Sequence, residues 1–259
     1  MIDTHAHIYL EDFDFDRREV IQRAKDAGVR KIILPNIDSS TIQAMHDLEA
    51  AYPDFCHVSI GVHPTSVKAN YKDELSIVHA ELQSRDYIAI GEIGIDLYWD
   101  TTHKTEQIKA FKQQIEWSLE YNKPVIIHVR ESHREIMEAL SPYKNSGLKG
   151  VFHSFGGSVE EAHEILSFGG FLLGINGIVT FKNSGLSDVL RRIDIRHIVL
   201  ETDAPYLTPV PFRGKRNESA YLTHTAEFLA DLYSISYEDV VKQTTGNALR
   251  LFNFFKISE

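Results

Sequence analysis

The 259-residue sequence predicts an α/β fold, specifically a single-domain TIM-type (β/α)8 barrel, from two regular features. Short apolar runs of strand length alternate with segments of helical periodicity along the chain. Eight such runs fit the length that this barrel typically needs, and the helices between them favour right-handed crossovers and parallel pairing. The predicted strands begin near Ile2, Lys31, His57, Tyr87, Pro124, Lys149, Gly170 and His197.

Two of the runs, residues 125–127 and 198–200, are apolar at every position, as expected of parallel strands that are buried on both faces. A doubly wound open sheet is the main alternative fold. That fold usually carries a glycine-rich phosphate turn after its first strand, whereas His5-Ala6-His7 occupies this place here. Because no linker, repeat or low-complexity segment interrupts the alternation, we predict one domain over residues 1–259.

The predicted helices carry start and stop signals. Asp16 and Glu19 have the spacing of a capping box, and Gly28 suits a left-handed residue after the same helix. Ser158 and Glu161 repeat the capping-box spacing. A further helix is indicated by a stripe of apolar residues at Ile108, Phe111, Ile115 and Leu119.

Composition limits the classes of function. The formal net charge of −10 argues against a broad basic surface for duplex DNA, although bound metal could still create a local cationic site. The single cysteine, Cys56, is expected in the core and suits a reducing compartment. We recognise neither a signal peptide nor an apolar segment of membrane-spanning length, so a cytoplasmic location without membrane association is expected.

Six of the eight predicted strands end in residues that suit a metal-dependent active site, which in a barrel lies at the carboxyl ends of the strands. His5 and His7 have the i, i+2 spacing that directs two imidazoles to one side of a strand. The other strand ends carry His63, Glu92 with Asp96, His128 with Arg130, His153, and Asp203. Any one of these could be a core or turn residue. Together, buried ionisable groups at one mouth need a partner, and a metal would supply it.

Six short motifs occur in a fixed order between residue 3 and about residue 252. They are His5-Ala6-His7, Gly61-Val62-His63-Pro64, Gly91-Glu92-Ile93-Gly94-Ile95-Asp96, Val151-Phe152-His153-Ser154-Phe155, Glu201-Thr202-Asp203-Ala204-Pro205-Tyr206 and Pro211-Phe212-Arg213-Gly214-Lys215-Arg216-Asn217-Glu218. This ordered set resembles the TatD family of metal-dependent deoxyribonucleases. Mild departures at Phe155 and in residues 97–99 touch no predicted ligand.

The resemblance implies a two-metal hydrolase of the amidohydrolase superfamily. The ligands that it implies are His5, His7 and Asp203 for one ion, His128 and His153 for the other, and Glu92 as the bridge. A glutamate has two oxygens and can bridge where many superfamily members use a carbamylated lysine, since no lysine ends a predicted strand here. Because the set contains no sulfur, Mg²⁺, Mn²⁺ and Zn²⁺ all remain open.

The activity implied by the resemblance is phosphodiester hydrolysis, most specifically 3′-5′ exonuclease trimming of single-stranded DNA ends. Two divalent ions would make hydroxide available near neutral pH. Asp203 would orient or deprotonate the attacking water, Glu92 would join the ions, and His63 would contact the phosphate or assist proton transfer to the leaving oxygen. An acidic chain with a narrow metal-lined mouth suits a single-stranded end better than a long duplex.

Basic and aromatic residues near the predicted mouth could bind the substrate. The candidates for phosphate contacts are Arg130, Arg213, Lys215 and Arg216. The last three belong to residues 205–217, a predicted strand-to-helix loop, where simple solvation is an equal alternative. The candidates for base stacking are Tyr98, Trp99, Tyr206 and Phe212, for which packing within the protein is slightly favoured.

Two other functions remain open from the sequence. The same barrel and metals could hydrolyse a carboxylic ester, lactone, amide or aminoacyl-tRNA bond, because a fold does not determine its substrate. The basic loop favours phosphate-rich substrates over these. A binding scaffold with a structural metal is disfavoured, because structural zinc sites are usually closed and often rich in cysteine. The sequence indicates no obligate protein partner and does not reveal the oligomeric state.

Overall fold

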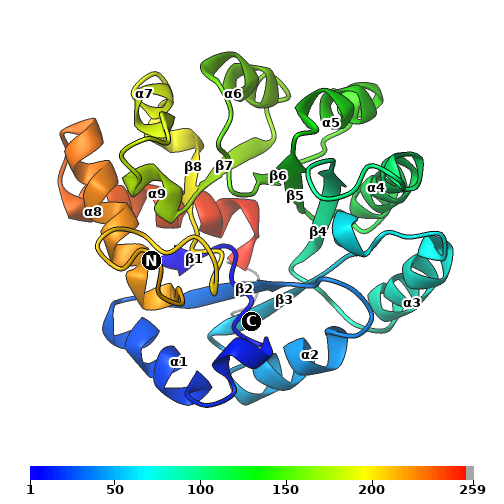
Figure 1. Ribbon diagram of the computed structural model, residues 1–259, viewed down its shortest axis with the longest axis horizontal. Helices are drawn as coiled ribbons and strands as arrows, with labels where there is room; N and C mark the ends of the chain where they lie inside the picture. The colour runs from blue at the N-terminus through cyan, green and yellow to red at the C-terminus, as the bar shows by residue number, and fades with distance from the viewer. Residues whose placement is uncertain (255–259) are drawn as a thin grey trace.

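The computed structural model describes residues 1–254 and confirms the (β/α)8 barrel. Eight parallel strands follow one another in chain order, and the helices form a ring outside them (Figure 1). The strands are β1 (Ile2–Asp3), β2 (Lys31–Pro35), β3 (Cys56–Ile60), β4 (Ala89–Asp96), β5 (Val125–Arg130), β6 (Gly150–Phe152), β7 (Phe171–Ile175) and β8 (Ile198–Leu200). The helices are α1 (Arg17–Asp26), α2 (Ile42–Ala51), α3 (Tyr71–Ser84), α4 (Lys104–Glu120), α5 (His133–Leu140), α6 (Val159–Leu166), α7 (Leu186–Leu190), α8 (Leu222–Tyr233) and α9 (Tyr237–Leu251). The end of the predicted domain, residues 255–259, lies outside the described range.

Backbone hydrogen bonds between the first and last strands close the barrel. The Thr4 amide donates to the Leu200 carbonyl at 3.0 Å, and the Asp203 amide donates to the His5 carbonyl at 2.9 Å. One residue beyond these bonds, Ala6 forms a parallel bridge with Ala204. The two ends of the barrel sequence therefore meet at the mouth, where the predicted ligands of β1 and β8 lie.

The opposite end of the barrel is filled by an apolar cluster. One inward-facing residue from each of six strands contributes to it, and α9 with the turn after it packs against the cluster. The Asn247 side chain of α9 also donates to the carbonyls of Ile195 and Ile198, at 3.1 and 2.7 Å. The last helix thus packs on the barrel itself. No helix within residues 1–254 has the length and apolar character needed to cross a membrane.

The helix signals are largely confirmed. Ser158 and Glu161 form a capping box at the start of α6, and Gly28 after α1 has φ of +82°. The predicted capping box of α1 is wrong: Asp16 precedes the helix, but its side chain caps no backbone amide. Its two carboxylate oxygens instead accept bonds from Arg216 at 2.8 and 2.7 Å. A guanidinium forms charge-assisted, bidentate bonds, which compete well with a single backbone N–H.

Candidate metal centre

Buried histidines and carboxylates from four strand ends converge at the mouth of the barrel. His5 Nε2 lies 3.1 Å from His7 Nε2 and 3.1 Å from Glu92 Oε2. Asp203 Oδ1 lies 3.7 Å from the Nε2 atoms of His5, His7 and His153 alike. The structure therefore brings these five side chains to one point, although they come from both ends and the middle of the sequence.

The second oxygen of Glu92 faces a different group of histidines. Glu92 Oε1 lies 2.9 Å from His128 Nδ1, 3.4 Å from His63 Nε2 and 3.9 Å from His153 Nε2. Because Oε2 approaches His5 while Oε1 approaches His128, the carboxylate stands between two sets of nitrogen donors. A carboxylate in this position could bridge two ions.

Burial and the charges of neighbouring groups together determine the pKa values of these side chains. It lowers the pKa of His7 to about 4 and raises the pKa of Asp203 to about 7. Burial also favours a high pKa for Glu92, but the surrounding histidines, His63 first, hold it well below its usual value. His153 behaves in the opposite sense: burial would lower its pKa, but Glu201 and the neighbouring carboxylates raise it to about 10. The mouth is a set of buried ionisable groups that depend on one another for charge compensation.

Asp96 and Glu201 contact the ring nitrogens of two histidines on the side away from the centre. The sequence analysis assigned neither carboxylate a role. Asp96 Oδ2 lies 2.9 Å from His128 Nε2, and Glu201 Oε1 lies 3.0 Å from His153 Nδ1. Such contacts orient a ring and leave its other nitrogen free for a metal. The available signal was position: each carboxylate shares a motif with a predicted ligand and is separated from it by an even number of residues.

Tyr9 supports His7 in the same manner. The Tyr9 hydroxyl donates to the Pro35 carbonyl at 2.6 Å, so its oxygen is free to accept a hydrogen bond from His7 Nδ1, 2.9 Å away. A proton on Nδ1 leaves the Nε2 lone pair of His7 directed towards the shared centre. Tyr9 lies two residues after His7, just outside the first motif, and sequence reasoning gave it no role in the metal centre.

These residues fit a pair of divalent cations. The donor atoms are imidazole nitrogens and carboxylate oxygens, a set that suits Mn²⁺ or Zn²⁺ and, through the oxygens, Mg²⁺. Two ring nitrogens 3.1 Å apart, on His5 and His7, would share a cation more favourably than they would face each other unliganded. The donor atoms form three close groups, namely His5, His7 and Asp203, then His5, Glu92 and His153, and finally His63, Glu92 and His128. The first group matches the expected ligands of one ion, and Glu92 belongs to both of the others, whereas the pairing of His128 with His153 on the second ion stays a prediction.

Comparison with known proteins agrees with this geometry. A protein-family model described as TatD related DNase matches residues 2–253. The chain belongs to the TatD family. A relative named as a metal-dependent hydrolase, YabD of Bacillus subtilis, is 37% identical over 253 residues, which cover 97% of this chain and 98% of YabD.

Two further TatD relatives extend the comparison. The 3′-5′ ssDNA/RNA exonuclease TatD of Pantoea ananatis is 31% identical over 258 residues, covering 97% of this chain and 99% of that enzyme. The crystal structure of YJJV, a TatD homologue from Escherichia coli, superposes with a TM-score of 0.91 at 28% identity and covers 98% of both chains. The protein is thus a metal-dependent hydrolase of the TatD family.

In this TatD protein, His63 is oriented by the turn that follows β3. The Thr65 amide donates to His63 Nδ1 at 3.2 Å, so we assign the ring proton of neutral His63 to Nε2. Nε2 is the atom that faces Glu92 and lies 3.3 Å from His128 Nδ1. His63 therefore presents a donor at the edge of the candidate metal centre, towards Glu92 and His128.

The predicted substrate-binding residues divide into two groups. At the mouth, the Arg130 guanidinium lies 3.9 Å from the ring centroid of Tyr98 and 5.1 Å from that of Trp99. These rings are 55% and 69% exposed, so they are available to a ligand. The aromatic residue Phe212, by contrast, stacks on Tyr221 with ring centroids 4.5 Å apart, in agreement with the packing interpretation.

The three basic residues of the loop between β8 and α8 are placed differently from Arg130. Arg216 is held by its bidentate pair with Asp16 and by the Asp12 carbonyl at 2.7 Å. The Arg213 guanidinium lies over the ring of Phe181 at 4.3 Å. Lys215 is exposed, as is Arg213. Arg216 thus has a structural partner, while the other two cations face solvent.

Proposed function

We propose that this TatD protein is a divalent-metal-dependent phosphodiesterase that shortens single-stranded DNA from its 3′ end. The observation that carries the proposal is the placement of Glu92, with one oxygen 3.1 Å from His5 and the other 2.9 Å from His128. A carboxylate between two nitrogen sets supports two adjacent ions, which would activate water and stabilise the charge that develops on phosphorus. The exonuclease name of the Pantoea relative supports the choice of substrate.

The surrounding side chains supply the remaining parts of the reaction. Asp203 is the more exposed of the two central carboxylates, with 13% of its side chain accessible against 3% for Glu92, so it can meet an incoming water. It would orient that water or accept its proton. His63 Nε2 would donate to the phosphate or to the leaving oxygen. The water oxygen joins phosphorus, the P–O3′ bond breaks, and a proton passes to the released O3′.

The mouth favours a flexible single strand over a duplex. Arg130 offers a guanidinium for a phosphate, and the exposed rings of Tyr98 and Trp99 offer stacking surfaces for unpaired bases. The net charge of −10 disfavours a broad contact with duplex DNA. The buried free thiol of Cys56 supports a reducing compartment such as the cytoplasm.

Metal-stripped protein and a 5′-labelled single-stranded oligonucleotide provide the test. Mg²⁺, Mn²⁺ and Zn²⁺ are added separately, with Glu92→Gln as the variant and Glu227→Gln, an exposed glutamate of α8, as its matched control. We expect stepwise shortening that needs metal, persists in the control and is lost in Glu92→Gln. DNA that stays intact with every metal, while esters or lactones are hydrolysed, would contradict the proposal.

A further inference from the structure

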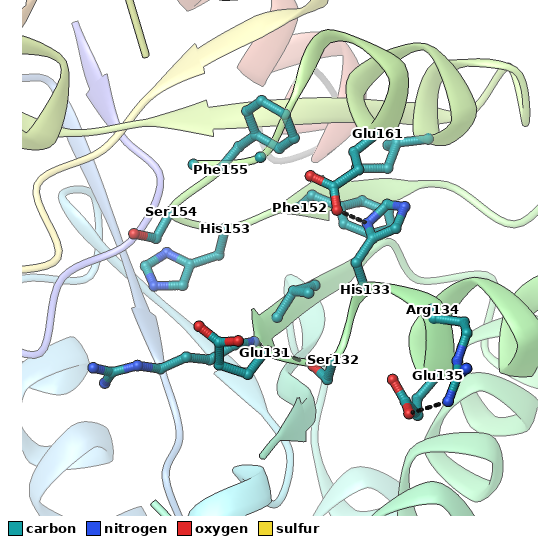
Figure 2. Close-up of a pocket in the computed structure, with 15 residues that line it drawn as sticks. Glu131, Ser132, His133, Arg134, Glu135, Phe152, His153, Ser154, Phe155 and Glu161 are labelled. Atoms are coloured by element: carbon teal, nitrogen blue, oxygen red, sulfur yellow. Dashed lines mark hydrogen bonds and ion pairs between the residues drawn. The ribbon is translucent and has the colours of Figure 1, made fainter. Parts of the chain in front are cut away.

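A pocket of about 480 Å³ lies beside the metal centre, between the segments that follow β5 and β6 (Figure 2). Its walls are formed by residues 129–135 and 152–157, together with two residues of α6. Figure 2 shows His153 and Glu131 near one another at one end, with His133 and Glu161 farther along the wall. His153, a candidate metal ligand, is also part of the wall, so the pocket borders the candidate metal centre. Its volume suits one small-molecule unit better than a length of polymer.

Most charged groups of the pocket wall are already paired. Glu135 accepts a bond from Lys104 at 2.7 Å, and Glu161 accepts the Ser158 amide of its capping box at 2.7 Å. Arg130 and Glu131 differ, since neither side chain has an ion pair within residues 1–254. The pocket therefore offers an unpaired guanidinium and an unpaired carboxylate on adjacent residues, next to the candidate metal centre.

We propose that this pocket binds the 3′-terminal nucleoside of the strand, while the 5′-phosphate of that nucleotide lies at the metal centre. The inference rests on the proposed phosphodiesterase function and specifies where the released unit is held. Arg130 would bind the phosphate, and Glu131 would accept hydrogen bonds from base amino groups or the sugar hydroxyl. The buried ring of Phe155 adds apolar wall surface for the base. A second phosphate would be repelled by the glutamates of the wall.

The arrangement determines which product remains bound. Hydrolysis breaks the P–O3′ bond between the terminal nucleotide and its neighbour, the water oxygen joins phosphorus, and the proton goes to the released O3′. The unit left in the pocket is a nucleoside 5′-monophosphate, and the shortened strand departs with a free 3′-hydroxyl. A 2′-deoxynucleoside 5′-monophosphate should therefore bind in this pocket, whereas a 3′-monophosphate places its phosphate away from the metal centre.

Substitutions of different size at Gly156 can fill the pocket to different extents. It lies in the wall and is exposed, and an added Cβ would meet no atom closer than the Ser154 carbonyl oxygen at 3.9 Å. Gly156→Ala should be accommodated, whereas Gly156→Trp should occupy space needed by the nucleoside. Glu131→Gln removes the unpaired charge, and Glu138→Gln is its matched control, because Glu138 is an exposed residue of α5 outside the pocket wall.

The variants are compared on a 5′-labelled single-stranded oligonucleotide and on bis(4-nitrophenyl) phosphate, a diester without a nucleoside. We expect Gly156→Trp to raise KM for the oligonucleotide about tenfold or more, with hydrolysis of the small diester unchanged, because only nucleoside binding is lost. Glu131→Gln should raise the same KM about tenfold. Gly156→Ala and Glu138→Gln should behave as the wild type. The small diester also reports whether each variant retains its fold and metals.

A binding measurement completes the test. Metal-loaded wild-type protein is titrated calorimetrically with 2′-deoxyadenosine 5′-monophosphate, and binding should be lost in Gly156→Trp. Gly156→Trp that trims DNA and binds the nucleotide as the wild type does would overturn the pocket inference and leave the nuclease proposal standing. Wild-type protein that hydrolyses the small diester but leaves every oligonucleotide intact would overturn both.

Discussion

Asp96 Oδ2 lies 2.9 Å from His128 Nε2, on the side of the ring opposite to Glu92. The imidazole is thereby held between two carboxylates, one at each nitrogen. Burial acts to lower the pKa of His128, but its hydrogen bonds to Asp96 and Glu92 raise it overall. When His128 carries its proton on Nε2 and donates it in a hydrogen bond to Asp96, the lone pair of Nδ1 is free to bind a metal. Asp96 therefore fixes the tautomer and the orientation of the His128 ring.

Asp96→Asn is therefore expected to weaken metal binding on the His128 side by about 10–100-fold and to lower activity with it. In the wild type, Asp96 accepts a hydrogen bond from the Tyr98 backbone N–H at 3.0 Å. The asparagine side chain keeps an oxygen for this bond, so the loop should stay in place. Bound metal per chain during Mn²⁺ titration measures the effect. Asp100→Asn, an exposed change in the same loop, is the control. Unchanged metal affinity in Asp96→Asn would refute the supporting role.

Tyr9→Phe should weaken metal binding at the site formed by His5 and His7, because the substitution removes the acceptor for His7 Nδ1–H. The expected loss of affinity is about tenfold. It also leaves the buried Pro35 carbonyl without this donor, so stability should fall by about 1–3 kcal/mol. Metal titration and denaturant unfolding separate the two effects. Tyr143→Phe, which removes a hydroxyl bonded to the surface residue Glu116, should leave metal affinity intact.

If Tyr9→Phe unfolds more easily but binds metal as tightly as the wild type, the contact with His7 has no role in orienting the ligand. That outcome would also weaken the tautomer assigned to His7.

Metal removal should lower the melting temperature. A ligand that binds only the native state at about a hundredfold above its Kd stabilises it by about 2.7 kcal/mol. For a chain of this size the resulting shift is about 5–10 °C. Scanning calorimetry of EDTA-treated protein, before and after Mn²⁺ is returned, measures it. Glu92→Gln should abolish the shift and Glu227→Gln should preserve it. Identical melting curves with and without metal in the wild type would argue against a native metal centre.

Arg216→Lys should affect stability more than substrate binding, because the bidentate pair with Asp16 would be lost. The two side chains are 31% and 33% exposed, so solvent screening limits the expected loss to about 0.2–1 kcal/mol. Denaturant midpoints measure this loss, and kinetics on the oligonucleotide measure KM. A large increase in KM without a change in stability would restore the phosphate-binding interpretation of Arg216.

The ion pair between Arg216 and Asp16 should also make the free energy of unfolding depend on pH in a defined direction. The hydrogen bond from Arg216 holds the pKa of Asp16 below its ordinary value. A carboxyl group with a lowered folded-state pKa contributes stability above its unfolded pKa and loses that contribution as the pH falls through the folded value. The difference in stability between wild type and Arg216→Lys should therefore be present at neutral pH and shrink in strong acid.

The barrel was predictable because its determinants are local and repeated. The apolar runs and capping signals recur along the chain, and parallel strands must bring their carboxyl ends to one mouth. Asp16 illustrates the limit of this reasoning. It has the same spacing to a glutamate as Ser158, but only the folded chain brings Arg216 to it, and the guanidinium then displaces the helix cap. Sequence spacing does not contain that long-range competition.

The candidate site was likewise predictable only in part. Residues expected at the mouth by position, such as His5, Glu92 and Asp203, are brought together by the fold. Position in its motif could have placed Glu201 near the mouth, but its contact with His153 depends on the orientation of a ring and on which nitrogen faces the centre, and spacing does not contain either. Arg130 and His153 were expected at the mouth, but the rest of the pocket wall, including Glu131, was missed because it combines two βα segments whose side chains show no common motif.

Because β1 and β8 lie side by side, the candidate metal centre can assemble only when almost the whole chain has been synthesised. His5 is among the first residues synthesised, but Asp203, 3.7 Å away in the fold, is added only after all eight strands have been made. At the usual rate of synthesis the interval is on the order of ten seconds or more. A nascent chain therefore carries the histidines and Glu92 without Asp203, and hydrolytic competence would arise in one late step rather than grow with chain length.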